Sequence, residues 1–220
     1  MINFDDDFSE LIVQQISPKN IDLFWADGWR NFGAYFFRNK FDYNAGNWLQ
    51  ILPLRINIEK FSFNKNQTKL LKKQANTLVK YQTIQIDERR NQIFEDHISR
   101  FKDNIPETIY TFLGQKPGII PCQALECALY DDNMQLYATS FFGVGQNAIS
   151  STYAMFDTQY AALSPGLHTL LLEIIYAQNH QKKYVYTGYC HREDTIYAYK
   201  KRFNGLEYYD WEGSWHDFVA

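Results

Sequence analysis

The sequence predicts a mixed α/β (α+β) protein with a large sheet in its second half, and three observations carry this prediction. Apolar segments separated by polar turns lie between residues 122 and 157, which is typical of an antiparallel meander. A helix start follows at Ser164 and Pro165, where serine can act as the N-cap and proline fits the first turn. The chain then returns to an extended segment, KKYVYTGY.

The first 60 residues are rich in aromatic side chains and predict short strands and turns. The clearest extended pieces are AYFFRN and LPLRINIEKF, and we expect Pro53 to open the second. A helix is predicted from Asn66 to Leu78, because this stretch combines strong helix formers with leucines on one side. The alternating segment LVKYQTIQID predicts the next strand.

Two helices are predicted between that strand and the meander. The first covers residues 87–104, with Asp87 as its N-cap and apolar side chains at helical spacing. The second is shorter and is expected to begin at Pro106 and to end at Gly114.

The helix that begins at Ser164 is expected to bury a broad apolar face. Its members are Leu167, Leu170, Leu171, Ile174 and Ile175. A short helix in TIYAYKKRF and a last strand in GLEYYDW complete the chain. From residue 80 onward the predicted order is β-αα-βββ-α-β-α-β, which is the element order of the GNAT-type acyltransferase fold. In that fold the acyl donor lies in a cleft between splayed central strands.

The composition limits the classes of function. A net charge of −3 argues against a protein that coats long nucleic acid, although a local basic patch is compatible with it. No apolar run approaches the ~20 residues that span a bilayer, and the acidic start MINFDDDFSE is unlike a secretory signal. We therefore expect no membrane association and a cytoplasmic location, which the three cysteines fit.

Several single motifs each allow two readings. The lysine group Lys65, Lys69, Lys72 and Lys73 fits a phosphate backbone or a solvated helix face. Asp157, at the end of a strand, could hold a cationic donor or simply form a turn. Only one glycine stands at the helix start near Ser164, which disfavours a coenzyme A pyrophosphate loop.

No metal or covalent chemistry is predicted. The histidines show no metal-ligand spacing, and a G-x-S-x-G elbow is absent. Cys122 and Cys127 are five residues apart, so they would point to opposite faces of one strand.

Five segments, in this order, resemble the aminoacyl-tRNA–protein transferases, the arginyl- and leucyltransferases of the N-degron pathway. GWRNFGAYFFR is similar to the family's G-W-R-R-x-G-x-x-x-Y-[RK], and LPLRINIEKF to its x-P-x-R-[IV] strand. KNQTKLLKK resembles its basic helix start. SSTYAMFDTQYAALSPGLHTLLLEI and YVYTGYCHREDTIYAYKKRF resemble its last two motifs. The resemblance spans most of the chain.

The resemblance implies transfer of arginine or leucine from aminoacyl-tRNA to the α-amine of a protein, with an acidic first residue. It implies a catalytic cleft formed by Tyr153, Asp157, Tyr199 and Lys200. It implies acceptor binding by Arg30, Arg38 and Arg55, and tRNA binding by Lys65, Lys69 and Lys72. The partners would be the acceptor end of charged tRNA and the acceptor's N-terminus, with no cofactor and no metal. It also implies an N-terminal region, residues 1–78, and a GNAT-like domain, residues 79–220.

The sequence departs from the family at several positions. Ala45, Trp48 and Ile51 stand where the family has a C-x-x-C-x-x-C stretch, so no metal or iron–sulfur role is expected there. Ile196-Tyr197, Asn204-Gly205, Thr158 and Thr68 also differ. Two alternatives therefore stay open: an aminoacyl-tRNA-binding paralogue without catalysis, and a coenzyme A-dependent N-acyltransferase. The general base and the oligomeric state are not assigned.

The segment YVYTGYCHREDTIYAYKKRF combines these expectations. Tyr184 and Tyr186 are expected to share one face of a strand. Gly188 would allow a ligand to approach the backbone, and the basic end would border the cleft.

Overall fold

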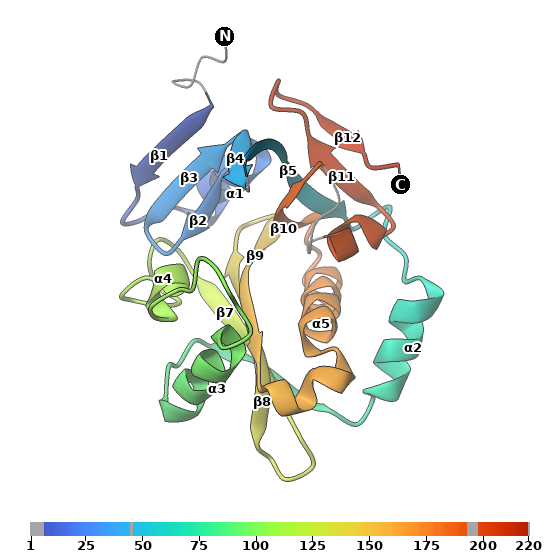
Figure 1. Ribbon diagram of the computed structural model, residues 1–220. Coiled ribbons are helices and arrows are strands. Elements are labelled where there is room, and N and C mark those ends of the chain that lie inside the picture. Colours follow the sequence, from blue (N-terminus) through green and yellow to red (C-terminus); the bar gives the residue numbers. More distant parts are fainter. Residues whose placement is uncertain (1–6, 45, 193–197, 220) are drawn as a thin grey trace.

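The computed structural model describes residues 7–44, 46–192 and 198–219, which form two sheets and the helices that cover them (Figure 1). The larger sheet has nine strands in the order β12-β11-β5-β10-β9-β8-β7-β6, with β4 paired to β5. The smaller sheet has the order β1-β3-β2. The expected mixed α+β class is confirmed.

The strands of the larger sheet are β4 (Phe41–Asn44), β5 (Asn47–Asn57), β6 (Leu78–Thr83), β7 (Ala124–Tyr130), β8 (Leu136–Val144), β9 (Ala148–Phe156), β10 (Tyr184–His191), β11 (Leu206–Tyr209) and β12 (Trp215–Asp217). The smaller sheet comprises β1 (Phe8–Ile12), β2 (Arg30–Phe32) and β3 (Tyr35–Asn39). The helices are α1 (Pro18–Ala26), α2 (Lys65–Lys73), α3 (Glu88–Ile98), α4 (Tyr110–Leu113) and α5 (Pro165–Asn179), with 3-10 turns η2 (Thr158–Leu163) and η3 (Ala198–Arg202). Among the described residues no helix is long and apolar enough to cross a membrane.

The predicted meander is present, since β6, β7, β8 and β9 pair in antiparallel order. Helices α2 and α5 cover one face of this sheet, and α3 and α4 cover the other (Figure 1). Helix α5 buries Leu171 and Ile174 completely, and full burial of such a side chain contributes about 1.5–3 kcal/mol. Apolar burial therefore fixes α5 against the middle of the sheet.

Strands β9 and β10 are parallel, but they pair over three residues only. The last pair is Tyr186 with Ser150. Each strand has a bulge at that point: Thr152 is the extra residue of β9 and Thr187 that of β10. A bulge bends its strand and increases its twist, so the two strands part beyond the bulges. This is the splay that the predicted acyltransferase fold requires.

The N-terminal part supports β10 from two directions. Helix α1 and the smaller sheet form a core cluster with Tyr186, and β5 lies in the larger sheet between β10 and β11. Part of the segment 1–78 thus completes the central sheet. The division into 1–78 and 79–220 stays a prediction.

Several element boundaries differ from the sequence-based expectations. Strand β5 begins at Asn47, so Pro53 lies within it, where the outer pairing changes from β4 to β11. Helix α2 ends at Lys73, before Leu78, and α4 begins at Tyr110, after Pro106. The cap of α2 is a reciprocal capping box between Asn64 and Gln67, which fixes its start firmly.

Two predicted caps have different outcomes. The side chain of Asp87 accepts a hydrogen bond from the Arg90 amide, as expected for an N-cap. Ser164 precedes α5 as predicted, but it has φ 53° and makes no side-chain cap bond. Of the helix predicted in TIYAYKKRF, residues 195–197 lie outside the described residues, and the described part is the 3-10 turn η3.

Candidate functional site

The site is built around the splay of β9 and β10, where the backbone of each strand lacks its neighbour. The Arg30 side chain donates to the carbonyl oxygens of Ser151 (3.2 Å) and Thr152 (3.4 Å) on β9. Across the splay, Lys200 Nζ donates to the carbonyl oxygens of Thr187 (2.8 Å) and Tyr189 (3.3 Å) on β10. Two basic side chains, one from β2 and one from η3, thus satisfy carbonyls at the point where the strands part.

Gly188 is required by this arrangement. It has φ +91°, and a Cβ built at this position would overlap the guanidinium of Arg30. The Arg30 guanidinium also lies 5.8 Å from the centre of the Tyr189 ring. The expectation that Gly188 leaves room for a ligand is corrected here, because Arg30 occupies that room.

The pKa of the Lys200 amine is lowered by its surroundings. Burial and the nearby Arg30 guanidinium lower the pKa of the Lys200 amine to about 7, although Cys190 and Glu173 act in the opposite direction. An amine with a pKa near neutrality is partly unprotonated at working pH, which a proton acceptor needs. Tyr199, also predicted for the cleft, precedes it on η3 and is 42% exposed.

Glu173 is a site residue that the sequence did not predict. It projects from the middle of α5 and has no exposed surface. Burial raises the pKa of its carboxyl to about 7, against the opposing effects of Ser140, Ser151 and Lys200. Neither serine forms a hydrogen bond of ordinary geometry with it, and both carboxyl oxygens lack a partner among the described residues. A glutamate inside the apolar run LLLEII was the available signal, because buried glutamates are rare unless paired.

Tyr153 lies on the opposite face of the sheet from α5. Its ring stacks on Phe112 of α4, with centroids 4.0 Å apart, in the cluster formed by α3 and α4. It lies two residues along β9 from Ser151, beyond the bulge residue Thr152. The role of Tyr153 in a catalytic cleft stays a prediction.

Asp157 directly follows β9, and each oxygen of its carboxylate accepts a hydrogen bond. One oxygen accepts from Arg89 Nη2 at 2.7 Å, and the other accepts from the Gln159 amide at 3.1 Å. It is only 8% exposed. The turn-forming reading of Asp157 thus has direct structural support, while its catalytic role stays a prediction.

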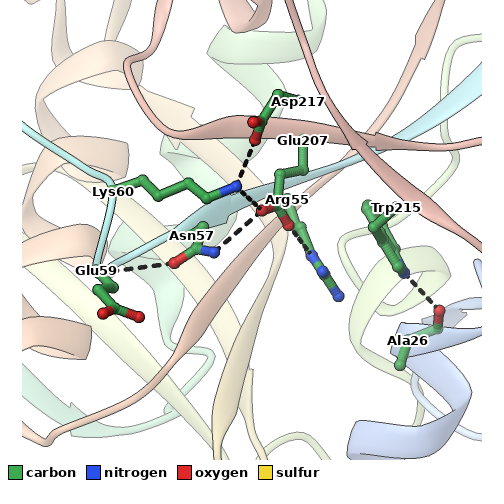
Figure 2. Close-up of polar contacts among 8 residues, drawn as sticks. All are labelled: Ala26, Arg55, Asn57, Glu59, Lys60, Glu207, Trp215 and Asp217. Carbon is green, nitrogen blue, oxygen red and sulfur yellow. Dashed lines mark hydrogen bonds and ion pairs between the residues drawn. The ribbon is translucent and has the colours of Figure 1, made fainter.

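Arg38 and Arg55 are matched by carboxylates within the fold. Arg38 Nη1 lies 2.6 Å from Asp27 Oδ2, and Arg55 Nε lies 2.7 Å from Glu207 Oε2. Figure 2 shows Glu207 at the centre of a cluster that Lys60, Asn57 and Arg55 share. Their acceptor-binding roles stay predictions.

The Arg55 guanidinium lies between two aromatic rings, 3.9 Å from the centre of Tyr184 and 4.1 Å from that of Trp215. Tyr184 and Tyr186 do share one face of β10, with ring centroids 6.3 Å apart. Cation–π contact and the ion pair with Glu207 together make Arg55 part of the structural support of β10.

The predicted tRNA-binding lysines follow one exposed face of α2. Lys65, Lys69 and Lys72 are exposed, whereas Leu70 and Leu71 pack against the core that α5 shares. Just before α2, the Asn64 side chain donates to the Arg202 carbonyl of η3 at 3.3 Å. The basic face of α2 therefore adjoins η3, which carries Lys200 into the splay.

The positions of the family's cysteines carry apolar contacts. Ile51 is buried against Tyr209 and Trp211, and the Trp48 ring lies 5.0 Å from that of Tyr43; Ala45 lies outside the described residues. Cys122 precedes β7 and joins a different core cluster from Cys127. Among the described residues no three potential ligands gather as a metal site.

The chain resembles known proteins in sequence. Residues 73–210, well over half of the chain, match the family model described as arginine-tRNA-protein transferase, C terminus. An aspartate/glutamate leucyltransferase of Helicobacter hepaticus is 24% identical over 200 residues, which is 89% of this chain and 81% of that protein. One from Stenotrophomonas maltophilia is 36% identical over 84 residues, 38% of this chain and 33% of that protein.

Solved structures show more distant likenesses. L-PGS from Bacillus licheniformis superposes with a TM-score of 0.49 and 11% identity, over 84% of this chain and 54% of that one. FemX superposes with a TM-score of 0.46 and 10% identity, over 80% of this chain and 61% of that one. At these values they say nothing about activity. The match to the family model decides the matter: the chain belongs to the aminoacyl-tRNA–protein transferase family and is an enzyme of that class.

Proposed function

We propose that this protein transfers leucine from leucyl-tRNA to the α-amine of a protein that begins with Asp or Glu. The ester that links an amino acid to tRNA is already activated, so the protein must mainly orient the two reactants and manage protons. The observation that carries the proposal is the splay of β9 and β10, where Arg30 holds a carbonyl of β9 and Lys200 holds a carbonyl of β10.

Leucine is supported over arginine by two observations. The relatives from Helicobacter hepaticus and Stenotrophomonas maltophilia are both named leucyltransferases. In addition, the carboxylate of Asp157, which was the sequence's only hint of a cationic donor, already holds Arg89 and the Gln159 amide. A buried carboxylate that already holds one guanidinium is a poor site for a second.

For the acceptor's acidic side chain we propose Arg30. Arg38 and Arg55 each pair with a carboxylate of the chain, and Arg30 donates to the Ser151 and Thr152 carbonyls at the splay, where we propose that the reaction occurs. A guanidinium at this position can pair with a carboxylate through charge-assisted hydrogen bonds.

For tRNA we propose that the acceptor stem lies along the basic face of α2. Lys65, Lys69 and Lys72 would contact its phosphates, and η3 would lead the 3′ end from there to the splay. The net charge of −3 fits contact with a small part of the tRNA. We propose no cofactor, so chelation with EDTA should leave transfer unchanged.

The test is a transfer assay with tRNA charged in parallel with radiolabelled leucine or arginine. Each donor would be offered peptides that differ only in a first residue of Asp, Glu or Ala. We expect label from leucyl-tRNA on the Asp and Glu peptides and none on the Ala peptide.

Label from arginyl-tRNA alone would replace the donor and keep the reaction. Charged tRNA bound without transfer would favour a binding protein. If the protein neither transfers label nor binds charged tRNA, the proposal is overturned.

A further inference from the structure

Glu173 raises a physical problem that the fold alone does not solve. A carboxyl group without hydrogen bonds in a protein interior costs several kcal/mol, about 2–7 even for a neutral polar group. Both of its oxygens, and the nearby Ser140 hydroxyl, lack partners among the described residues. Replacing Glu173 with leucine would extend the apolar face of α5, so packing does not explain a glutamate at this position.

The charged and titratable groups around Glu173 come from several elements. Cys127 on β7 and Tyr81 on β6 are neutral groups whose pKa values burial raises, and Glu173 raises both further. Ser140 and Ser151 are uncharged hydroxyl groups of β8 and β9. Of these neighbours, only Lys200 carries the opposite charge.

The surroundings of Lys200 are equally specific. Among the described residues, Arg30 of β2 and Cys190 of β10 also act on its pKa. Its Nζ donates to two backbone carbonyls, those of Thr187 and Tyr189. These two contacts hold the amine against the backbone of β10.

We propose that Glu173 is a positioning residue for the transfer reaction: its carboxylate balances Arg30 and holds Lys200 as the group that carries a proton from the attacking nitrogen to the leaving 3′ oxygen. This inference rests on the proposed function, because it assigns the proton carrier of that reaction. Lys200 is then a catalytic residue, and Glu173 acts through it.

The proton balance of the step is as follows. The acceptor's α-ammonium loses one proton to solvent and attacks the ester carbon as an amine, forming the C–N bond. The second proton passes from that nitrogen to the Lys200 amine. As the C–O bond of the ester breaks, Lys200 returns this proton to the 3′ oxygen, which leaves as the tRNA hydroxyl. Lys200 ends unchanged, and no oxidant or other reactant is needed.

Glu173→Gln tests this role, because it removes the charge with little change of shape. The pH at which half of Lys200 is protonated can be measured independently of aminoacyl transfer. The folded protein is labelled with acetic anhydride at a series of pH values, and mass spectrometry of the peptide that contains Lys200 gives this titration midpoint. We expect Glu173→Gln to move this midpoint down by about one pH unit or more, the usual effect of losing a nearby opposite charge. The acid limb of kcat should move to lower pH with it, with KM unchanged.

Two variants serve as comparisons. Glu173→Asp keeps the charge and should keep the Lys200 midpoint. Glu95→Gln makes the same chemical change on the exposed side of α3 and should change neither the labelling nor the kinetics. The urea midpoint of each variant shows that the fold is retained.

A labelling midpoint that Glu173→Gln leaves in place would overturn the inference, and so would a shifted midpoint with an unchanged pH profile of transfer. If the unmodified protein transfers nothing while the labelling midpoint still shifts, the proposed function fails but the coupling of Glu173 to Lys200 is supported. The two failures are therefore distinguishable.

Discussion

Glu126 on β7 and Glu173 on α5 are both completely buried, yet their surroundings are opposite. Glu126 accepts from Arg90 Nε at 2.6 Å and Nη2 at 2.8 Å, from Thr139 Oγ1 at 2.7 Å and from Gln82 Nε2 at 3.1 Å. Glu173 has no such bond among the described residues. One carboxylate is saturated by its own fold and the other is not.

The difference separates structural charge from functional charge. Around Glu126, a bidentate arginine and two further donors leave nothing for a ligand to satisfy. Around Glu173, Lys200 supplies the opposing charge, and Arg30 in turn acts on Lys200. Buried ionic groups without full satisfaction are more often found where chemistry occurs than where stability is made.

The largest effect is expected from breaking the saturated cluster. Glu126→Ala leaves the Arg90 guanidinium buried beside Asp87 alone, and such changes cost about 3–5 kcal/mol of unfolding free energy. Urea unfolding measures this loss. The double variant Arg90→Met with Glu126→Leu should recover much of it, since no charge is then stranded. A loss below about 1 kcal/mol would show that the cluster is not the structural charge described here.

The next largest effect is expected on the rate of transfer, from a change at the splay of β9 and β10. Lys200→Met removes the proton carrier and should lower kcat for transfer by about 100-fold or more, which is typical of lost general acid–base catalysis. Single-turnover measurements with charged tRNA detect this directly. Lys80→Met, on the exposed side of β6, is the matched control and should transfer at the normal rate. Equal rates for the two variants would exclude Lys200 from the chemistry.

The third prediction compares stability across pH. The pKa of Glu173 is about 7 when folded and 4.5 when unfolded, so the folded state binds the proton more tightly. Ionising the buried Glu173 carboxyl lowers the unfolding free energy. This loss is absent below pH 4.5, grows as pH rises, and is complete above pH 7. Glu173→Gln should therefore gain up to about 3 kcal/mol relative to the unmodified protein between these limits. Urea unfolding of both proteins at pH 5 and pH 8 measures this gain. A difference in unfolding free energy that is the same at both pH values would contradict the prediction.

The smallest effect is expected at the exposed lysines, where water already screens the charges. Lys65→Gln combined with Lys69→Gln should raise the apparent KM for charged tRNA and reduce the slope of log affinity against log salt by about 2. kcat at saturating tRNA should not change. An unaltered salt slope would remove α2 from the tRNA-binding surface.

The sequence predicted most of the framework because its signals are local. Alternation and polar turns fixed β7, β8 and β9, and the Ser-Pro start with its apolar stripe fixed α5. The same Ser-Pro signal at Ser17 and Pro18 begins α1, with Ile21 and Trp25 one turn apart on its buried face. The prediction of short strands and turns for the first 60 residues misses this helix, although its signal is present. Strand β12 has only three residues and depends on its pairing with β11.

The site was predictable only in part, because its properties arise between distant elements. Lys200 and Arg30 were recognisable from family motifs, but their meeting across the splay depends on where β2 and η3 are placed. Asp157 and Arg55 match the motifs equally well, yet their charges are engaged by Arg89 and Glu207. No local pattern in the sequence distinguishes a side chain that forms an ion pair within the fold from one that lies at the splay.

The splay also determines when the enzyme can first act during its own synthesis. Arg30 reaches Ser151 across 121 positions of the chain, and Lys200 comes later still. Strand β5 waits for β10 and β11 before it has neighbours on both sides. Contacts of such long range form late. A ribosome-bound chain that ends short of η3 therefore lacks the side chain that holds the Thr187 and Tyr189 carbonyls.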